Sequence, residues 1–222
     1  MRLPQLHFTK FQVAVHVLAW LPLLVLIWDA LNGNLTVNPI QTATLHTGKF
    51  ALLFLTLSLA VTPLHTITGW NPLIRVRRTL GLYAFMYAAL HFLTFSGLDY
   101  GFALDLIVAE LTQKPYIIAG SAALVILIAL AFTSTKGWQR RLKQNWRRLH
   151  RFVYAASILV IVHYIWLVKN HQGEPWIWGA AIAFLLVMRI PVVRRTVVNW
   201  RVRFKQKRRT LPATLPTQAH DA

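Results

Sequence analysis

Residues 116–135 read YIIAGSAALVILIALAFTST and contain no charged side chain. A helix needs about 20 predominantly apolar residues to cross the hydrocarbon core of a bilayer, and this block has that length. Five other blocks of similar character lie along the chain. They cover residues 11–31, 47–64, 80–98, 151–168 and 176–193. The sequence therefore predicts an all-α fold, a polytopic membrane protein with a bundle of six transmembrane helices.

The composition supports this fold class and narrows the chemistry. The 222-residue chain is 56% hydrophobic and 14% charged, whereas soluble domains carry about 25% charged residues. Cysteine is absent, which excludes disulfides, Cys-ligated iron–sulfur clusters, thiolate-ligated haem and covalent CxxCH haem attachment. Any redox centre must therefore use histidine, methionine or an organic cofactor.

The positive charges predict the orientation in the membrane. The formal net charge is +18, and the Lys and Arg residues gather after the second, fourth and sixth apolar blocks. Under the positive-inside rule these segments and both termini are cytoplasmic. The pattern favours anionic lipid headgroups over nucleic acid as the contact. We expect a cytoplasmic N-terminus (1–10), a transmembrane domain (11–198) and a basic, then disordered, cytoplasmic tail (199–222).

The connection between the third and fourth blocks carries apolar residues at helical spacing. This spacing, over residues 105–112, predicts a short helix that lies in the outer membrane interface. No internal repeat is evident in the sequence.

Ionisable residues inside a membrane span are costly, so each is a candidate for function. His91 lies eleven residues into the third block, and His163 lies thirteen residues after His150, which marks the cytoplasmic mouth of the fifth. At 1.5 Å per residue, His91 and His163 are both expected roughly 16–20 Å from the cytoplasmic ends. Two histidines from different helices at one depth can provide both axial ligands of a haem iron.

Small residues surround His91 at helical spacing: Gly81, Ala84 and Ala88, followed by Phe95. This stripe leaves a groove for a flat macrocycle, but ordinary packing of a neighbouring helix produces the same pattern.

His150 is a third candidate ligand. On a continuous helix it would lie about 20 Å from His163 and about 140° around the axis, which suits a second redox centre near the cytoplasmic face. The alternative is an interfacial histidine among basic residues that face lipid headgroups. His16, His46 and His65 are weaker candidates, as ligands or as hydrogen-bonding and packing residues.

Four arginines near the cytoplasmic ends are candidates for binding a cofactor's anionic group. Arg77, Arg78, Arg147 and Arg148 suit a flavin phosphate or haem propionates, because guanidinium groups bind such oxyanions in a bidentate manner. Alternatively, these positive charges serve only to orient the helices in the membrane, which requires no ligand.

Three segments carry a resemblance to a known family. They are PLLVLIWDALNG (22–33), RVRRTLGLYAFMYAALHFLTF (75–95) and AFTSTKGWQRRLKQNWRRLHRFVYAASILVIVHYIW (131–166). The chain resembles the MsrQ (YedZ) family, the haem-binding membrane subunits of the periplasmic methionine-sulfoxide reductase system. That family belongs to the ferric-reductase-like transmembrane group, which includes the membrane parts of NADPH oxidases.

The resemblance implies b-type haem, one or two per chain, with His91, His150 and His163 as axial ligands. It also implies bound FMN, the bacterial inner membrane and a periplasmic molybdenum-cofactor subunit that reduces methionine sulfoxide in proteins. The electrons would come from quinol or a cytosolic flavin reductase. Larger relatives continue into flavin- and nicotinamide-binding regions, whereas this sequence contains no glycine-rich phosphate loop. We therefore expect electrons to arrive from another molecule.

The expected function is transmembrane electron transfer, with the catalytic chemistry in the partner subunit. Two alternatives remain open at this point. One is a stand-alone haem-dependent ferric or quinone reductase. The other is a small transporter whose buried histidines relay protons or bind substrate.

Overall fold

The structure is a computed structural model that describes residues 9–168 and 173–210, and it contains no strand in these ranges. The first eight residues of the expected N-terminal segment and the tail from residue 211 lie outside them. The helices are α1 (Lys10–Leu31), α2 (Pro39–Thr68), α3 (Pro72–Leu93), a π-helix (Thr94–Asp99), α4 (Leu104–Gln113), α5 (Pro115–Phe132), α6 (Lys136–Leu149), α7 (Phe152–Leu167), α8 (Glu174–Val187) and α9 (Pro191–Thr210).

Proline and capping residues place several helix starts. Pro39, Pro72 and Pro115 each stand in the first turn of a helix. Backbone N–H groups in the first turn have no partner within the helix, so the N–H that proline lacks costs no hydrogen bond there. Thr9 caps α1 through a reciprocal capping box with Gln12. These local signals set the helix boundaries independently of the apolar blocks between them.

The all-α membrane fold is confirmed, and the count of spans depends on two bends. Within the described residues, α1, α2, α3 with its π-helical extension, and α5 are each long and apolar enough to cross a bilayer. Two further pairs qualify only together: α6 with α7, bent by 49°, and α8 with α9, bent by 77°. By length and composition, the described residues thus contain four candidate spans, or six if each bent pair forms one.

The bends alter two predicted ranges. The predicted block 151–168 coincides with α7, which is 16 residues long and therefore spans about 24 Å. The predicted block 176–193 runs across the α8–α9 bend, which lies between Val187 and Pro191 and contains Arg189. The basic start of the predicted tail is helical as far as Thr210.

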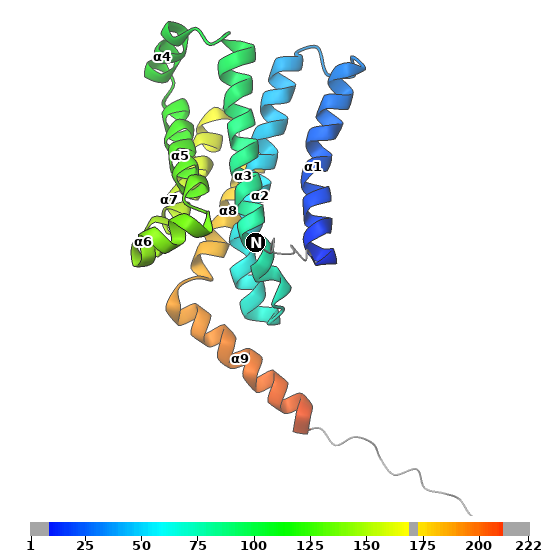
Figure 1. Ribbon diagram of the computed structural model, residues 1–222, viewed down its shortest axis with the longest axis vertical. Coiled ribbons are helices and arrows are strands. Elements are labelled where there is room, and N and C mark those ends of the chain that lie inside the picture. The colour runs from blue at the N-terminus through cyan, green and yellow to red at the C-terminus, as the bar shows by residue number, and fades with distance from the viewer. Residues whose placement is uncertain (1–8, 169–172, 211–222) are drawn as a thin grey trace, which may run out of the picture.

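Figure 1 shows α4 at one end of the bundle and α6 with α9 at the opposite end. The main packing pairs are α2 with α3 and α5 with α7, and α3 also contacts α5. The fully buried side chains at this centre include Leu59, Val76, Tyr87 and Ser157. Two helix pairs therefore form the body of the molecule, and the other helices lie around them.

Helix α1 is held to the bundle through polar contacts beside its internal Pro22. The Tyr87 hydroxyl donates to the Ala19 carbonyl (2.8 Å) and accepts from the Leu23 N–H (3.1 Å), so it replaces the backbone bond between those two residues. The His46 Nε2–H donates to the Pro22 carbonyl at 3.0 Å. His46 thus has a structural partner.

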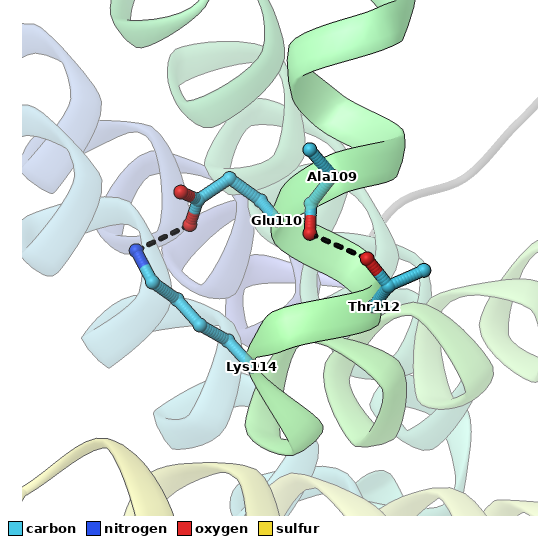
Figure 2. Close-up of polar contacts among 4 residues, drawn as sticks. All are labelled: Ala109, Glu110, Thr112 and Lys114. Carbon is cyan, nitrogen blue, oxygen red and sulfur yellow. Dashed lines mark hydrogen bonds and ion pairs between the residues drawn. The ribbon is translucent and has the colours of Figure 1, made fainter.

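Helix α4 confirms the short helix expected over 105–112, with Leu104 and Val108 among its exposed apolar residues. Figure 2 shows its C-terminal end, where Lys114 forms an ion pair with Glu110 and the Thr112 hydroxyl donates to the Ala109 carbonyl at 2.8 Å. The hydrogen bond to Glu110 raises the pKa of Lys114. These contacts close α4 immediately before α5 begins at Pro115.

Candidate functional site

Two of the predicted histidines meet between the two helix pairs, toward the end of the bundle that carries α4. His91 on α3 and His163 on α7 have ring centroids 6.2 Å apart, and their ring planes are nearly perpendicular at 83°. Two imidazoles that bind one metal through Nε2, with bonds of about 2.0–2.1 Å, would have centroids roughly 6 Å apart. The pair therefore has the separation of two ligands that share one metal ion.

Backbone carbonyls determine which nitrogen of each ring is free. The His91 Nδ1 lies 2.8 Å from the Thr44 carbonyl, and the His163 Nδ1 lies 2.7 Å from the Tyr116 carbonyl. A carbonyl only accepts hydrogen bonds, so each Nδ1 carries the proton and each Nε2 presents a lone pair. This is the usual arrangement of metal-binding histidines, in which the ring nitrogen that does not bind the metal donates a hydrogen bond to a fixed acceptor.

Two glycines that the sequence reasoning missed make room for these rings. A Cβ at Gly48 would lie 2.9 Å from the His91 Nδ1, and a Cβ at Gly120 would lie 2.7 Å from the His163 Nδ1. Each glycine follows the carbonyl residue by one helical turn, Thr44 before Gly48 and Tyr116 before Gly120. No side chain other than hydrogen fits at either position without displacing the histidine.

The α2–α3 and α5–α7 pairs repeat one design. Each histidine lies 47 positions after the residue whose carbonyl it binds. Each also packs on a glycine of the preceding helix in its pair. The sequence showed no repeat because the surrounding apolar residues differ, whereas the shared features are a glycine, a histidine and their spacing.

The small residues around His91 support helix packing. A Cβ at Gly81 would find only the Ser58 hydroxyl of α2, at 3.5 Å, and Ala84 is completely buried in the core. Within the described residues, no group of three or more His, Cys, Asp or Glu side chains could hold a metal ion. The His91–His163 pair suits an iron whose remaining positions are supplied by a macrocycle.

His150 lies apart from this pair, at the turn that joins α6 to α7. The expectation of one continuous helix from His150 to His163 is wrong, since α6 ends at Leu149 and α7 begins at Phe152 with a bend of 49°. The His150 ring stacks on Trp146 with centroids 4.0 Å apart, and its Nδ1 lies 3.2 Å from the Trp146 carbonyl. Its Nε2 is buried and makes no hydrogen bond within the described residues.

The four candidate arginines differ in their surroundings. Arg77 is half-buried, and its carbonyl accepts a hydrogen bond from the Ser58 hydroxyl at 3.2 Å. Arg78, Arg147 and Arg148 are exposed. Exposure of these three agrees with the topology explanation, whereas Arg77 points to a more specific role.

The other histidines in the described part of the chain, His16, His46 and His65, have structural partners. The His16 Nδ1 lies 2.8 Å from the Tyr83 hydroxyl, and the His65 Nε2 lies 3.2 Å from the Asn71 side-chain oxygen. With His46 bound to the Pro22 carbonyl, these contacts favour the hydrogen-bonding role that the sequence left open for such residues.

A helical membrane bundle with a facing histidine pair defines a class of redox membrane proteins, and the comparison with known families agrees. Residues 42–161 match the family model described as "Ferric reductase like transmembrane component". The matched range contains most of both helix pairs, with both glycines and His91, and ends two residues before His163.

Three relatives carry the name "Protein-methionine-sulfoxide reductase heme-binding subunit MsrQ". The chain is 41% identical to the one from Xanthomonas euvesicatoria, over 79% of this chain and 84% of the relative. It is 42% identical to those from Rhodospirillum rubrum (83% and 89% covered) and Herminiimonas arsenicoxydans (84% and 86% covered). The chain therefore belongs to the MsrQ family within the ferric-reductase-like transmembrane proteins.

Proposed function

We propose that this chain is the transmembrane electron-transfer subunit of a protein-methionine-sulfoxide reductase system, and that it binds b-type haem through His91 and His163. The observation that carries the proposal is the facing histidine pair, with each Nδ1 bound to a backbone carbonyl and each Nε2 free. The names of the relatives, which are haem-binding subunits of this system, support the same function.

The protein's own groups explain how such a site would work. The bonds to the Thr44 and Tyr116 carbonyls hold the histidines as neutral Nε2 donors and fix the orientation of their rings. Bound haem supplies reversible one-electron chemistry at iron. With His91 and His163 as the protein ligands, bound haem would have no open site for oxygen or another small ligand, so the site would favour electron transfer.

A second cofactor position is proposed at the basic end of the bundle. His150 would contribute a ligand to a second haem, and FMN would bind nearby. The buried Nε2 of His150, which makes no hydrogen bond within the described residues, supports this assignment. The donor is quinol or a cytosolic flavin reductase, which agrees with the absence of a glycine-rich phosphate loop in this sequence.

The acceptor is proposed to be a periplasmic molybdenum-cofactor subunit that reduces methionine sulfoxide in oxidised proteins, so the catalytic chemistry would occur in that partner. The relatives' names, which identify them as subunits of a protein-methionine-sulfoxide reductase, support an association of this kind. In the bacterial inner membrane, the end with α6 and α9 would face the cytoplasm and the end with α4 the periplasm.

A difference spectrum of the detergent-purified protein tests the proposal. We expect the dithionite-reduced minus oxidised spectrum to show b-type haem, with one or two haems per chain by pyridine haemochrome. A colourless protein after expression with ample haem would contradict the proposal and favour the transporter alternative. Reduction of ferric iron or quinone by the isolated chain, without any periplasmic partner, would instead favour a stand-alone reductase.

Labelling of single cysteines tests the orientation. The natural sequence has no cysteine, so Gln113→Cys after α4 and Gln144→Cys on α6 each introduce one exposed thiol. We expect a membrane-impermeant maleimide to label Gln113→Cys in intact spheroplasts, and to label Gln144→Cys only after the membrane is opened, because the basic α6 faces the cytoplasm. The reverse pattern would overturn the proposed orientation.

A further inference from the structure

Arg189 lies at the bend between α8 and α9, within the last predicted apolar block. Its guanidinium donates one hydrogen bond to the Tyr154 hydroxyl and one to the Leu59 carbonyl, both at 2.7 Å. Its Cζ lies 5.1 Å from the centre of the Tyr154 ring. The side chain thus connects α2, α7 and the end of α8 at the basic end of the bundle.

The charge of Arg189 is not balanced within the described part of the chain. Both of its hydrogen-bond partners are neutral, and its Nε is buried without any partner. The ion pairs in the described residues are Lys49 with Glu174 and Lys114 with Glu110. A partly buried cation with an unsatisfied N–H is costly unless an anion accompanies it.

A second arginine is close to the first. Arg77 and Arg189 contact neighbouring residues of α2: the Arg77 carbonyl accepts from the Ser58 hydroxyl at 3.2 Å, and the Arg189 guanidinium donates to the Leu59 carbonyl. His150 lies four residues before Tyr154, the other partner of Arg189. Two guanidinium groups beside each other repel, and an oxyanion between them would turn that repulsion into two charge-assisted contacts. The buried Nε2 of His150 belongs to the same region.

We propose that Arg77 and Arg189 form an anion site beside His150, which binds a carboxylate or phosphate group of a bound cofactor. The proposal rests on the proposed function, since it assigns these residues to the cofactor at the basic end. It adds Arg189 and selects Arg77 from the four arginines, because the other three are exposed. The oxyanion belongs to either a haem propionate or a flavin phosphate.

Cofactor content of purified holoprotein variants tests the site. We expect Arg189→Gln to bind about tenfold less, or still less, of one cofactor per chain. Loss of a supporting contact at metal sites has an effect of this size. Loss of haem with FMN unchanged identifies a propionate, and loss of FMN with haem unchanged identifies a phosphate. Arg189→Lys, which keeps the charge, should recover part of the occupancy, and Arg195→Gln on exposed α9 should behave as the natural protein.

Tyr154→Phe separates anion binding from a purely structural role. It removes the neutral partner of Arg189 but leaves the charge, so we expect both cofactors to be retained. If Arg189→Gln keeps both cofactors, or if Tyr154→Phe lowers their content as much as Arg189→Gln does, the anion site is wrong.

A cofactor-independent measurement distinguishes this proposal from the proposed function. The test compares inorganic phosphate with chloride at equal ionic strength, using protein from which the cofactors have been removed. Phosphate should raise the unfolding temperature of the natural protein and of the Arg195→Gln variant, but not that of the Arg189→Gln variant. If the natural protein contains neither haem nor FMN, the proposed function fails, and this shift still supports or overturns the anion site.

Discussion

His163→Ala is expected to remove the b-type haem held by the His91–His163 pair while the protein still inserts into the membrane. The substitution deletes one of the two free Nε2 atoms of the facing pair. Loss of an outer hydrogen-bonding partner alone weakens metal binding by about 10–100-fold, and loss of the ligand itself should cost at least as much. Insertion should persist because it depends on the apolar helices, which the substitution leaves intact. Haem per chain and membrane-fraction yield measure the two effects separately.

The matched control is His65→Ala. His65 also lies on a membrane-spanning helix, near the end of α2. Its Nε2 contacts Asn71, just before α3, and is away from the pair. We expect His65→Ala to retain the full haem content. Full haem retention in His163→Ala, with yield equal to that of the natural protein, would show that the pair is not the haem site.

The meeting of His91 and His163 was predictable because helix geometry is regular. The rise per residue converts sequence position into depth, so two histidines counted from the same membrane face could be placed at one level. The cost of ionisable groups in a bilayer identified both residues in the first place. The structure brings their rings together as that reasoning requires, whereas their role as haem ligands remains a prediction.

The supporting residues were not predictable in the same way. Gly48 and Gly120 matter because α2 packs on α3 and α5 packs on α7, and an apolar block does not reveal its neighbour. Arg189 had a usable signal, because it is an ionisable residue inside an apolar block. Its block was interpreted as an uninterrupted span, although Pro191, which begins α9, also signals a helix end at this point.

The bend before α7 has a related cause. The segment from Lys136 to Leu149 is strongly basic, so it cannot extend the apolar helix into the membrane and turns away from α7 by 49°. Sequence position alone placed His150 on the same helix as His163. His150 instead ends α6, so its ring stacks on Trp146, which lies one turn earlier on that helix.

Gly120→Ala is expected to disrupt the haem site although it adds only one methyl group. The new Cβ would lie 2.7 Å from the His163 Nδ1 and 3.0 Å from its Cε1, so the ring must move. Movement breaks the hydrogen bond to the Tyr116 carbonyl and misdirects the Nε2. We expect about 10–100-fold weaker haem binding, together with a shift in the haem midpoint potential and its low-spin spectrum. Haem titration and potentiometry of the purified protein measure these changes.

Gly81→Ala is the matched control, because it makes the same change in a helix of the same bundle. A Cβ there would meet only the Ser58 hydroxyl, at an ordinary 3.5 Å. Alanine is favoured over glycine in a helix interior by about 1 kcal/mol, so Gly81→Ala should bind haem normally and unfold at an equal or higher temperature. The same helix preference acts at position 120, which means that haem loss in Gly120→Ala cannot come from a weaker helix. An unchanged spectrum and potential in Gly120→Ala would show that His163 does not depend on this contact, and the design shared by the two helix pairs would then have no role in holding the cofactor.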